Sequence, residues 1–121
     1  MKYRREESFR YTFETPLEGV FKILIVSSDN MKETSEAPIE VVDISPGGLC
    51  FTSSLDMPLE NKEFLLEVHF SLADEPIVIL GKIVWKRHYA NAYMYGFEAV
   101  EDEKTEQQII DHLKMFIQEN R

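Results

Sequence analysis

Two short segments of the sequence carry side chains suited to binding an anionic ligand. The first contains Arg4, Arg5 and Arg10, three guanidinium groups close to the N-terminus. The second, residues 43–48, reads Asp-Ile-Ser-Pro-Gly-Gly. Guanidinium groups bind phosphate oxygens and purine edges, whereas a carboxylate accepts hydrogen bonds from N–H groups. Together the two segments predict a split site for a small ligand that carries both phosphates and purine edges.

Each segment also has a purely structural interpretation. Asp, Ser, Pro and Gly are favoured in β-turns, because they provide local hydrogen bonds, a fixed φ and a positive φ respectively. Charged residues near an N-terminus are usually just solvated. Neither interpretation explains why both segments occur in one chain whose remaining sequence predicts a barrel.

The composition is that of one ordinary globular domain, with 121 residues, 44% hydrophobic and 29% charged. The net charge of −9 argues against general DNA or RNA binding, which needs many cationic contacts. It does not argue against one anionic ligand held by a local basic cluster. The first ten residues contain four basic and two acidic residues, so this end is the most basic part of the chain.

The N-terminal sequence and the lack of a long apolar run point to a cytoplasmic protein. No apolar run approaches the roughly 20 residues that span a bilayer, and the N-terminus lacks the apolar core of a secretion signal. The single cysteine, Cys50, excludes an internal disulfide. Because it lies between Leu49 and Phe51, we expect a small buried side chain rather than a reactive thiol.

The hydrophobic pattern predicts six β-strands. They cover residues 20–26, 39–44, 49–52, 64–70, 77–85 and 93–100, and residues 27–37 are expected to form a polar hairpin loop. In the fourth strand, Phe64, Leu66, Val68 and Phe70 alternate onto one face. Gly81 indicates a bulge or a sharp bend. Six strands with short connections and internal glycines predict a small closed or nearly closed barrel.

The C-terminal residues 105–119 change to a helical period. Thr105 and Gln108 fit a capping box, with Thr105 as the N-cap. An apolar stripe follows, made of Ile109, Ile110, Leu113, Phe116 and Ile117. We expect this stripe to cover an open end of the barrel.

Catalytic and metal-binding motifs are absent from the sequence. His69, His88 and His112 are scattered without the spacing of metal ligands. There is no phosphate-binding loop, nucleophile elbow or dinucleotide fingerprint. We therefore expect a non-catalytic protein with no metal and no cofactor.

The segment 85–88 offers a second group of aromatic and basic side chains. Trp85 is expected to pack in the core or at the rim, with contact to a ligand or partner as the minority interpretation. Lys86, Arg87 and His88 are expected to form a solvated hairpin end, which would also add positive potential near a phosphate.

The spacing Asp-x-Ser-x-x-Gly of Asp43, Ser45 and Gly48, preceded by the arginine cluster, resembles the two motifs of PilZ domains. These domains are the cyclic di-GMP receptors of bacteria. The likeness extends over the whole chain, including the Trp85 strand, the late Tyr-Gly-Phe at 95–97 and the terminal helix. The resemblance implies a mainly β fold, a six-stranded antiparallel β-barrel with a C-terminal α-helix. Residues 1–121 would be one domain, with a flexible arginine-bearing segment 1–13, a barrel 17–100 and a helix 105–119.

The resemblance also implies a ligand and a mechanism. Cyclic di-GMP would be bound by Arg5, Arg10, Asp43, Ser45 and Gly48, with Arg4 as an additional candidate. The arginines would hold phosphate oxygens and the guanine O6/N7 edge, and Asp43 would accept from the guanine N1–H and amino group. Ser45 would offer a hydroxyl, and Gly48 would let the backbone approach the ligand. Ligand would order the N-terminal segment and present a new surface to a protein partner.

The arginine spacing departs from the family pattern. The family's first motif usually separates two arginines by three residues, whereas four residues lie between Arg5 and Arg10. Glu6 stands four positions before Arg10, and a carboxylate there would repel phosphate. The first alternative is therefore a degenerate PilZ-like adaptor that binds proteins but not cyclic di-GMP. The second is an acidic barrel with another anionic ligand or substrate.

Overall fold

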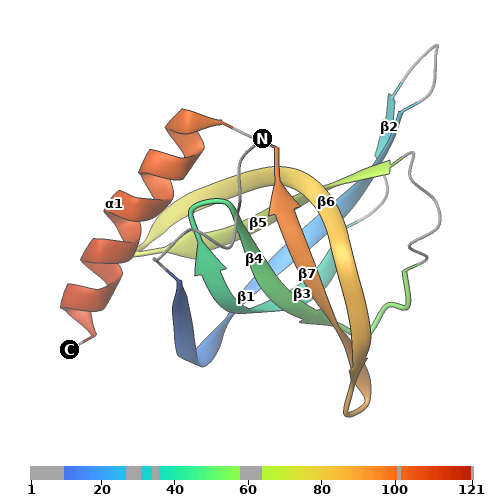
Figure 1. Cartoon of the computed structure of the whole chain (residues 1–121), viewed down its shortest axis with the longest axis horizontal. Helices are drawn as coiled ribbons and strands as arrows, with labels where there is room; N and C mark the ends of the chain where they lie inside the picture. Colours follow the sequence, from blue (N-terminus) through green and yellow to red (C-terminus); the bar gives the residue numbers. More distant parts are fainter. Residues whose placement is uncertain (1–9, 27–30, 34–35, 58–63, 101, 121) are drawn as a thin grey trace.

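The computed structural model of the chain describes residues 10–26, 31–33, 36–57, 64–100 and 102–120 (Figure 1). These residues form seven strands and one helix. The elements are β1 (Tyr11–Val26), β2 (Met31–Glu33), β3 (Ala37–Ser45), β4 (Gly48–Ser53), β5 (Phe64–Leu72), β6 (Glu75–Tyr89), β7 (Ala92–Ala99) and α1 (Glu103–Glu119).

The strands form one antiparallel sheet in the order β2-β1-β3-β4-β7-β6-β5, and an additional pairing of β1 with β5 closes it. The closed part is the predicted six-stranded antiparallel barrel with a C-terminal helix. The three-residue strand β2 pairs with the far end of β1, from Leu24 opposite Glu33 to Val26 opposite Met31. The expected loop 27–37 therefore contains a short strand, because pairing there satisfies the backbone groups of the end of β1.

Strand β1 begins at Tyr11, earlier than the expected strand at 20–26 and the expected barrel start at residue 17. Tyr11 and Thr12 pair with β3, and the register then shifts between Thr12 and Leu17. The sequence does not indicate this part of the strand, because it is polar and contains Pro16. The irregular register accommodates a proline that a regular ladder would exclude. Residues 11–13 thus lie in the sheet, directly after Arg10.

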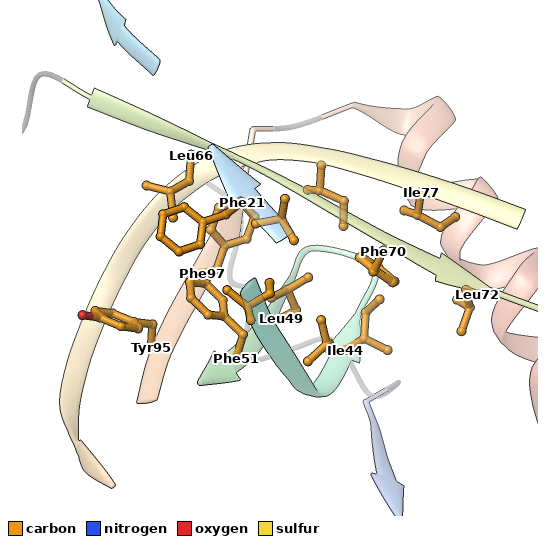
Figure 2. Packing of buried hydrophobic residues seen from close by; sticks show 14 of the residues in the cluster. Phe21, Ile44, Leu49, Phe51, Leu66, Phe70, Leu72, Ile77, Tyr95 and Phe97 are labelled. Carbon is orange, nitrogen blue, oxygen red and sulfur yellow. The ribbon is translucent and has the colours of Figure 1, made fainter. Parts of the chain in front are cut away.

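The core fills the inside of the barrel (Figure 2). Phe51 is central, because its ring centroid lies 6.1 Å from that of Phe21, 5.4 Å from Tyr95 and 6.4 Å from Phe97. The alternation predicted for β5 is confirmed for its described side chains: Leu66, Val68 and Phe70 are buried.

Two bulges shape the outer face of the sheet. The β3–β4 register shifts between Val41 and Asp43, and the β6–β7 register shifts between Ile83 and Trp85. The irregularity of β6 therefore lies at Val84 and not at Gly81, which pairs regularly with both neighbouring strands. Because of this bulge, Val84 and Trp85 are both exposed although they are adjacent in sequence.

The turn between β3 and β4 consists of Pro46 and Gly47. No glycine in the described parts of the chain has a positive φ. The turn therefore forms without the left-handed backbone that turn glycines often supply. The left-handed residues are Ala73 and Asp74 in the β5–β6 hairpin and Ala90 in the β6–β7 hairpin.

Helix α1 begins at Glu103, with Asp102 as its N-cap. The predicted cap at Thr105 with Gln108 is therefore wrong by one turn. The Asp102 carboxylate accepts from the Lys104 backbone N–H at 3.2 Å and from the Thr105 hydroxyl at 2.7 Å. Because the Asp102 carboxylate accepts both hydrogen bonds, Asp102 is the N-cap. Thr105 lies inside the helix and donates one of these hydrogen bonds.

The helix docks at one end of the barrel and contacts β5 and β6 (Figure 1). Ile109 and Leu113 are completely buried in the barrel core, as the apolar stripe predicted. The Phe116 ring makes edge contacts with Tyr11 at 6.0 Å and Phe13 at 5.3 Å between centroids. No helix among the described residues has the length and apolar character that crossing a membrane requires.

Candidate ligand-binding site

A surface cavity of about 670 Å³ lies over strands β3, β4, β7 and β6. Its volume is within the range of about 300–1,000 Å³ that is typical of small-molecule sites. The lining residues include four of the predicted site residues, Arg10, Asp43, Ser45 and Gly48. Arg4 and Arg5 lie outside the described residues.

The strand register explains how residues distant in sequence meet in this cavity. Asp43 on β3 is opposite Thr12 on β1 and Cys50 on β4. Cys50 is in turn opposite Gly96 on β7, and Gly96 is opposite Trp85 on β6. These positions form one row across five strands, and laterally paired residues lie on the same face of a sheet.

The guanidinium of Arg10 donates to the carboxylate of Asp43, which makes an ion pair at the edge of the cavity. The Arg10 side chain is 52% exposed and that of Asp43 20% exposed. An ion pair with this exposure contributes less than about 1 kcal/mol to folding. Both groups therefore remain accessible to a ligand that offers better partners.

Ser45 and Gly48 lie at the turn that closes this end of the cavity. The Ser45 hydroxyl is buried and donates to the Gly48 carbonyl at 3.4 Å. A Cβ on Gly48 would lie 2.2 Å from the Phe97 carbonyl oxygen. The close approach that requires a glycine is thus made by strand β7, whereas the sequence prediction assigned it to the ligand. The Ala99 N–H donates to the Gly47 carbonyl at 2.9 Å and fixes the turn against β7.

Trp85 and Arg87 also line the cavity, together with Met94 and Glu98. Residues 85 and 87 share a face of β6, and the register shift between Ile83 and Trp85 sets which face that is. Trp85 is 40% exposed, so it packs at the rim and not in the core. The Arg87 guanidinium carbon lies 5.2 Å from the centre of the Trp85 ring, in a cation–π contact.

The neighbours of Arg87 in the expected basic segment take other roles. Lys86 donates to the carboxylate of Asp56 and to the Met57 carbonyl at 2.9 Å, which ties the segment after β4 to the barrel. His88 packs against Tyr93 with 4.9 Å between ring centroids. Both residues belong to β6, which extends to Tyr89, so they lie in the paired end of the β6–β7 hairpin.

Cys50 forms part of the cavity floor. Burial, together with the nearby Asp43 carboxylate, raises the pKa of its thiol to about 11, although the Arg10 and Arg87 guanidinium groups act in the opposite direction. The thiol is therefore protonated at neutral pH. This agrees with the prediction of a small buried side chain.

The charged groups at the cavity suit a ligand with both acidic and N–H groups. Arg10 and Arg87 can bind phosphate or carbonyl oxygens, and Asp43 can accept hydrogen bonds. No group of His, Cys, Asp and Glu side chains in the described part of the chain could hold a metal ion. A second cavity of about 580 Å³ is lined by Glu18 and Glu40 without a basic residue, so it is unsuited to an anion.

Comparisons with known proteins agree with the fold. The family model of the PilZ domain matches residues 4–115. The structure of the PilZ domain with c-di-GMP of YcgR from Escherichia coli is similar, with a TM-score of 0.63 and 17% identity over 98% of this chain and 95% of that one. The PilZ domain of CeSA from a cellulose-synthesizing bacterium is similar with a TM-score of 0.53 and 13% identity, over 94% and 100% of the two chains. No curated protein matches the sequence.

Proposed function

Since the chain belongs to the PilZ domain family, we propose that it binds cyclic di-GMP non-covalently in the cavity over β3, β4, β7 and β6. PilZ domains are non-catalytic cyclic di-GMP receptor domains. The ligand-binding residues would be Arg10, Asp43, Ser45 and Gly48, with Arg5 and, in addition, Arg4 from the N-terminal segment.

The observation that carries the proposal is the meeting of Arg10 and Asp43 at one cavity. Arg10 directly precedes β1 and Asp43 lies in β3, 33 residues later in sequence, yet their side chains form an ion pair. In the complex this pair would exchange partners. The Arg10 guanidinium would bind a phosphate or the guanine O6/N7 edge, and the Asp43 carboxylate would accept from the guanine N1–H and amino group.

Ser45 and Gly48 would act mainly by shaping the site. The Ser45 hydroxyl is committed to the Gly48 carbonyl, and Gly48 is needed for the close contact with β7. The tight turn between them keeps Asp43, two residues before Ser45, at a fixed place relative to the cavity. A larger residue at either position would therefore weaken binding by moving the wall of the site.

The signal would be passed on through the N-terminal segment. Arg10 directly precedes β1 and lines the cavity. We propose that the ligand draws the N-terminal segment over the cavity through Arg5 and Arg10. The ordered segment would then be the new surface that a protein partner recognises.

Calorimetric titration with cyclic di-GMP tests the proposal. Arg10→Ala and Asp43→Ala should each weaken binding about ten-fold or more, because one good bidentate contact contributes about 1–3 kcal/mol. Lys114→Ala, which removes a charge from the exposed side of α1, is the matched control and should bind normally. All three variants should stay folded, since the Arg10–Asp43 pair contributes little to stability.

The opposite result would favour the adaptor alternative. Absence of binding heat and of a thermal shift at millimolar cyclic di-GMP, in a protein that melts cooperatively, would contradict the receptor proposal. A different nucleotide that raises the melting temperature would instead favour the barrel with another anionic ligand.

A further inference from the structure

The indole of Trp85 lies against strand β7 in a way that depends on Gly96. The two residues are opposite each other in the β6–β7 register. A Cβ on Gly96 would lie 2.1 Å from the indole Nε1. Only a glycine there lets the indole rest on the β7 backbone, and the ring remains 40% exposed at the cavity.

Arg87 adds a positive charge next to this indole. Its guanidinium contacts the Trp85 ring at 5.2 Å and the Met94 sulfur at 3.7 Å. Among the described residues, no carboxylate forms an ion pair with Arg87. A guanidinium that lines the cavity without an ion pair to a described carboxylate is suited to bind an anion.

The Trp85–Arg87 wall is distant from Asp43. Strands β4 and β7 lie between β3 and β6, so three strand spacings of about 4.8 Å, or roughly 14 Å along the sheet, separate the two walls. Trp85 and Arg87 can therefore contact a part of the ligand that Arg10 and Asp43 do not reach.

We propose that Trp85 and Arg87 are further ligand-contact residues and that Gly96 positions the indole. A guanine base stacks on the exposed indole, and the Arg87 guanidinium moves from the ring to a phosphate of the same ligand. This inference rests on the proposed function, because it assigns a second wall of the same site to cyclic di-GMP.

Tryptophan fluorescence can measure this contact without an added label, since Trp85 is the only tryptophan of the chain. Addition of cyclic di-GMP should change the indole emission in proportion to the occupancy measured by calorimetry. Trp85→Leu should weaken calorimetric binding about ten-fold or more, and Trp85→Phe, which keeps an aromatic ring, should recover part of the loss. Tyr89→Leu, a change of an exposed aromatic residue on the same strand outside the cavity, should bind normally.

Two further variants test the other members of the wall. Arg87→Gln should weaken binding about ten-fold, whereas Lys114→Gln on α1 should not. Gly96→Ala should shift the indole emission of the free protein and weaken binding. Because Gly96 is buried, Gly96→Ala can fail to fold, so its binding result counts only if the variant melts cooperatively. Arg87 is at an exposed position, so Arg87→Gln tests the proposal even if Gly96→Ala does not fold.

The outcomes separate this inference from the proposed function. One outcome would overturn only the roles proposed for Trp85 and Arg87. In it, the unsubstituted chain binds cyclic di-GMP with unchanged indole emission, and the affinities of Trp85→Leu and Arg87→Gln lie within two-fold of its affinity. Absence of binding by the unsubstituted chain would overturn the proposed function and this inference with it.

Discussion

At the scale of single residues, the cavity combines accessible charged groups with one inert thiol. Arg10 is exposed and pairs with the half-buried Asp43, whereas Cys50 is buried beside them. The thiolate is the reactive form of cysteine, so the raised pKa of Cys50 determines its chemistry.

The first prediction concerns the reactivity of Cys50. Its pKa is raised from 9.0 to about 11, so the thiolate fraction at about pH 8 is roughly a hundred-fold below that of an ordinary thiol. A disulfide-exchange reagent should therefore label the folded chain far more slowly than the urea-unfolded chain. Equal rates in the two states would contradict the buried, protonated thiol.

The same shift gives a stability prediction with a definite sign. A pKa that is raised on folding means that the native state holds the proton more tightly than the unfolded state. This contribution is present below pH 9 and is lost as the pH rises toward about 11. Cys50→Ala should therefore show a weaker loss of melting temperature over that interval than the unsubstituted chain.

The residue scale also shows what the sequence could and could not predict about the site. Asp43, Ser45 and Gly48 were found because they are close in sequence and their types fit a turn. Trp85 and Arg87 were not assigned to the site because the bulge at Val84 decides which side of β6 they face. A bulge depends on the pairing of two strands, so no local pattern reveals it.

At the scale of elements, the helix α1 is held by its cap and by its apolar stripe. The hydrogen bond from Thr105 and those from the backbone lower the pKa of the Asp102 carboxyl. The sequence predicted the stripe correctly for Ile109, Leu113, Phe116 and Ile117, which belong to the core or pack against it, because helical period is a strong signal. It misplaced the cap, since Asp102 and Thr105 are both good capping residues and only the course of the chain after β7 distinguishes them.

The second prediction follows from that cap. Asp102→Ala should lower the melting temperature by a few degrees at neutral pH, because two donors lose their acceptor. Because the pKa is lowered on folding, this stabilisation is present above the ordinary aspartate pKa and is lost as the pH falls through the lowered value. The difference between variant and unsubstituted chain should therefore shrink below about pH 4.

The control for this prediction is Asp111→Ala, which removes a carboxylate from the middle of the same helix, where it accepts from Gln107. It should destabilise less than Asp102→Ala in thermal melts. If Asp102→Ala had no effect and Thr105→Ala did, the helix would begin at the cap that the sequence predicted.

At the scale of the whole molecule, a closed barrel presents the cavity on its outer face while its first strand links the site to the helix. Tyr11 and Phe13 follow Arg10 and contact Phe116 of α1 through ring edges. The net charge of −9 repels an anionic ligand at long range. Under the proposed function, binding would depend on the local arginines and should be sensitive to each of them.

The sequence predicted that the strands form a closed or nearly closed barrel, but not which strands pair to close it. Six short strands with internal glycines indicated a barrel, and the structure closes it through β1 and β5. The early start of β1 was not predicted, because its residues 11–19 pair through an irregular register around Pro16. Long-range pairing, and not local propensity, makes that segment a strand.

The third prediction concerns the N-terminal segment. Saturating cyclic di-GMP should slow amide hydrogen exchange in residues 1–13, because the ligand would draw the arginines onto the cavity. Mass spectrometry of peptides with and without ligand measures this, and the peptide that contains β2 (Met31–Glu33), remote from the cavity, provides the internal control. Exchange of residues 1–13 that is unchanged by bound ligand would contradict the relay while leaving the binding site intact.

The most direct measurement of the central claim is an NMR titration of the ¹⁵N-labelled chain with cyclic di-GMP, because it shows where the ligand binds. The account predicts that the largest shifts fall on Arg10, Asp43, Ser45 and Gly48, and that the indole N–H of Trp85 moves with them. Residues of the acidic cavity at Glu18 and Glu40 should stay unchanged. Shifts confined to that second cavity, or no shifts at millimolar ligand, would contradict the account.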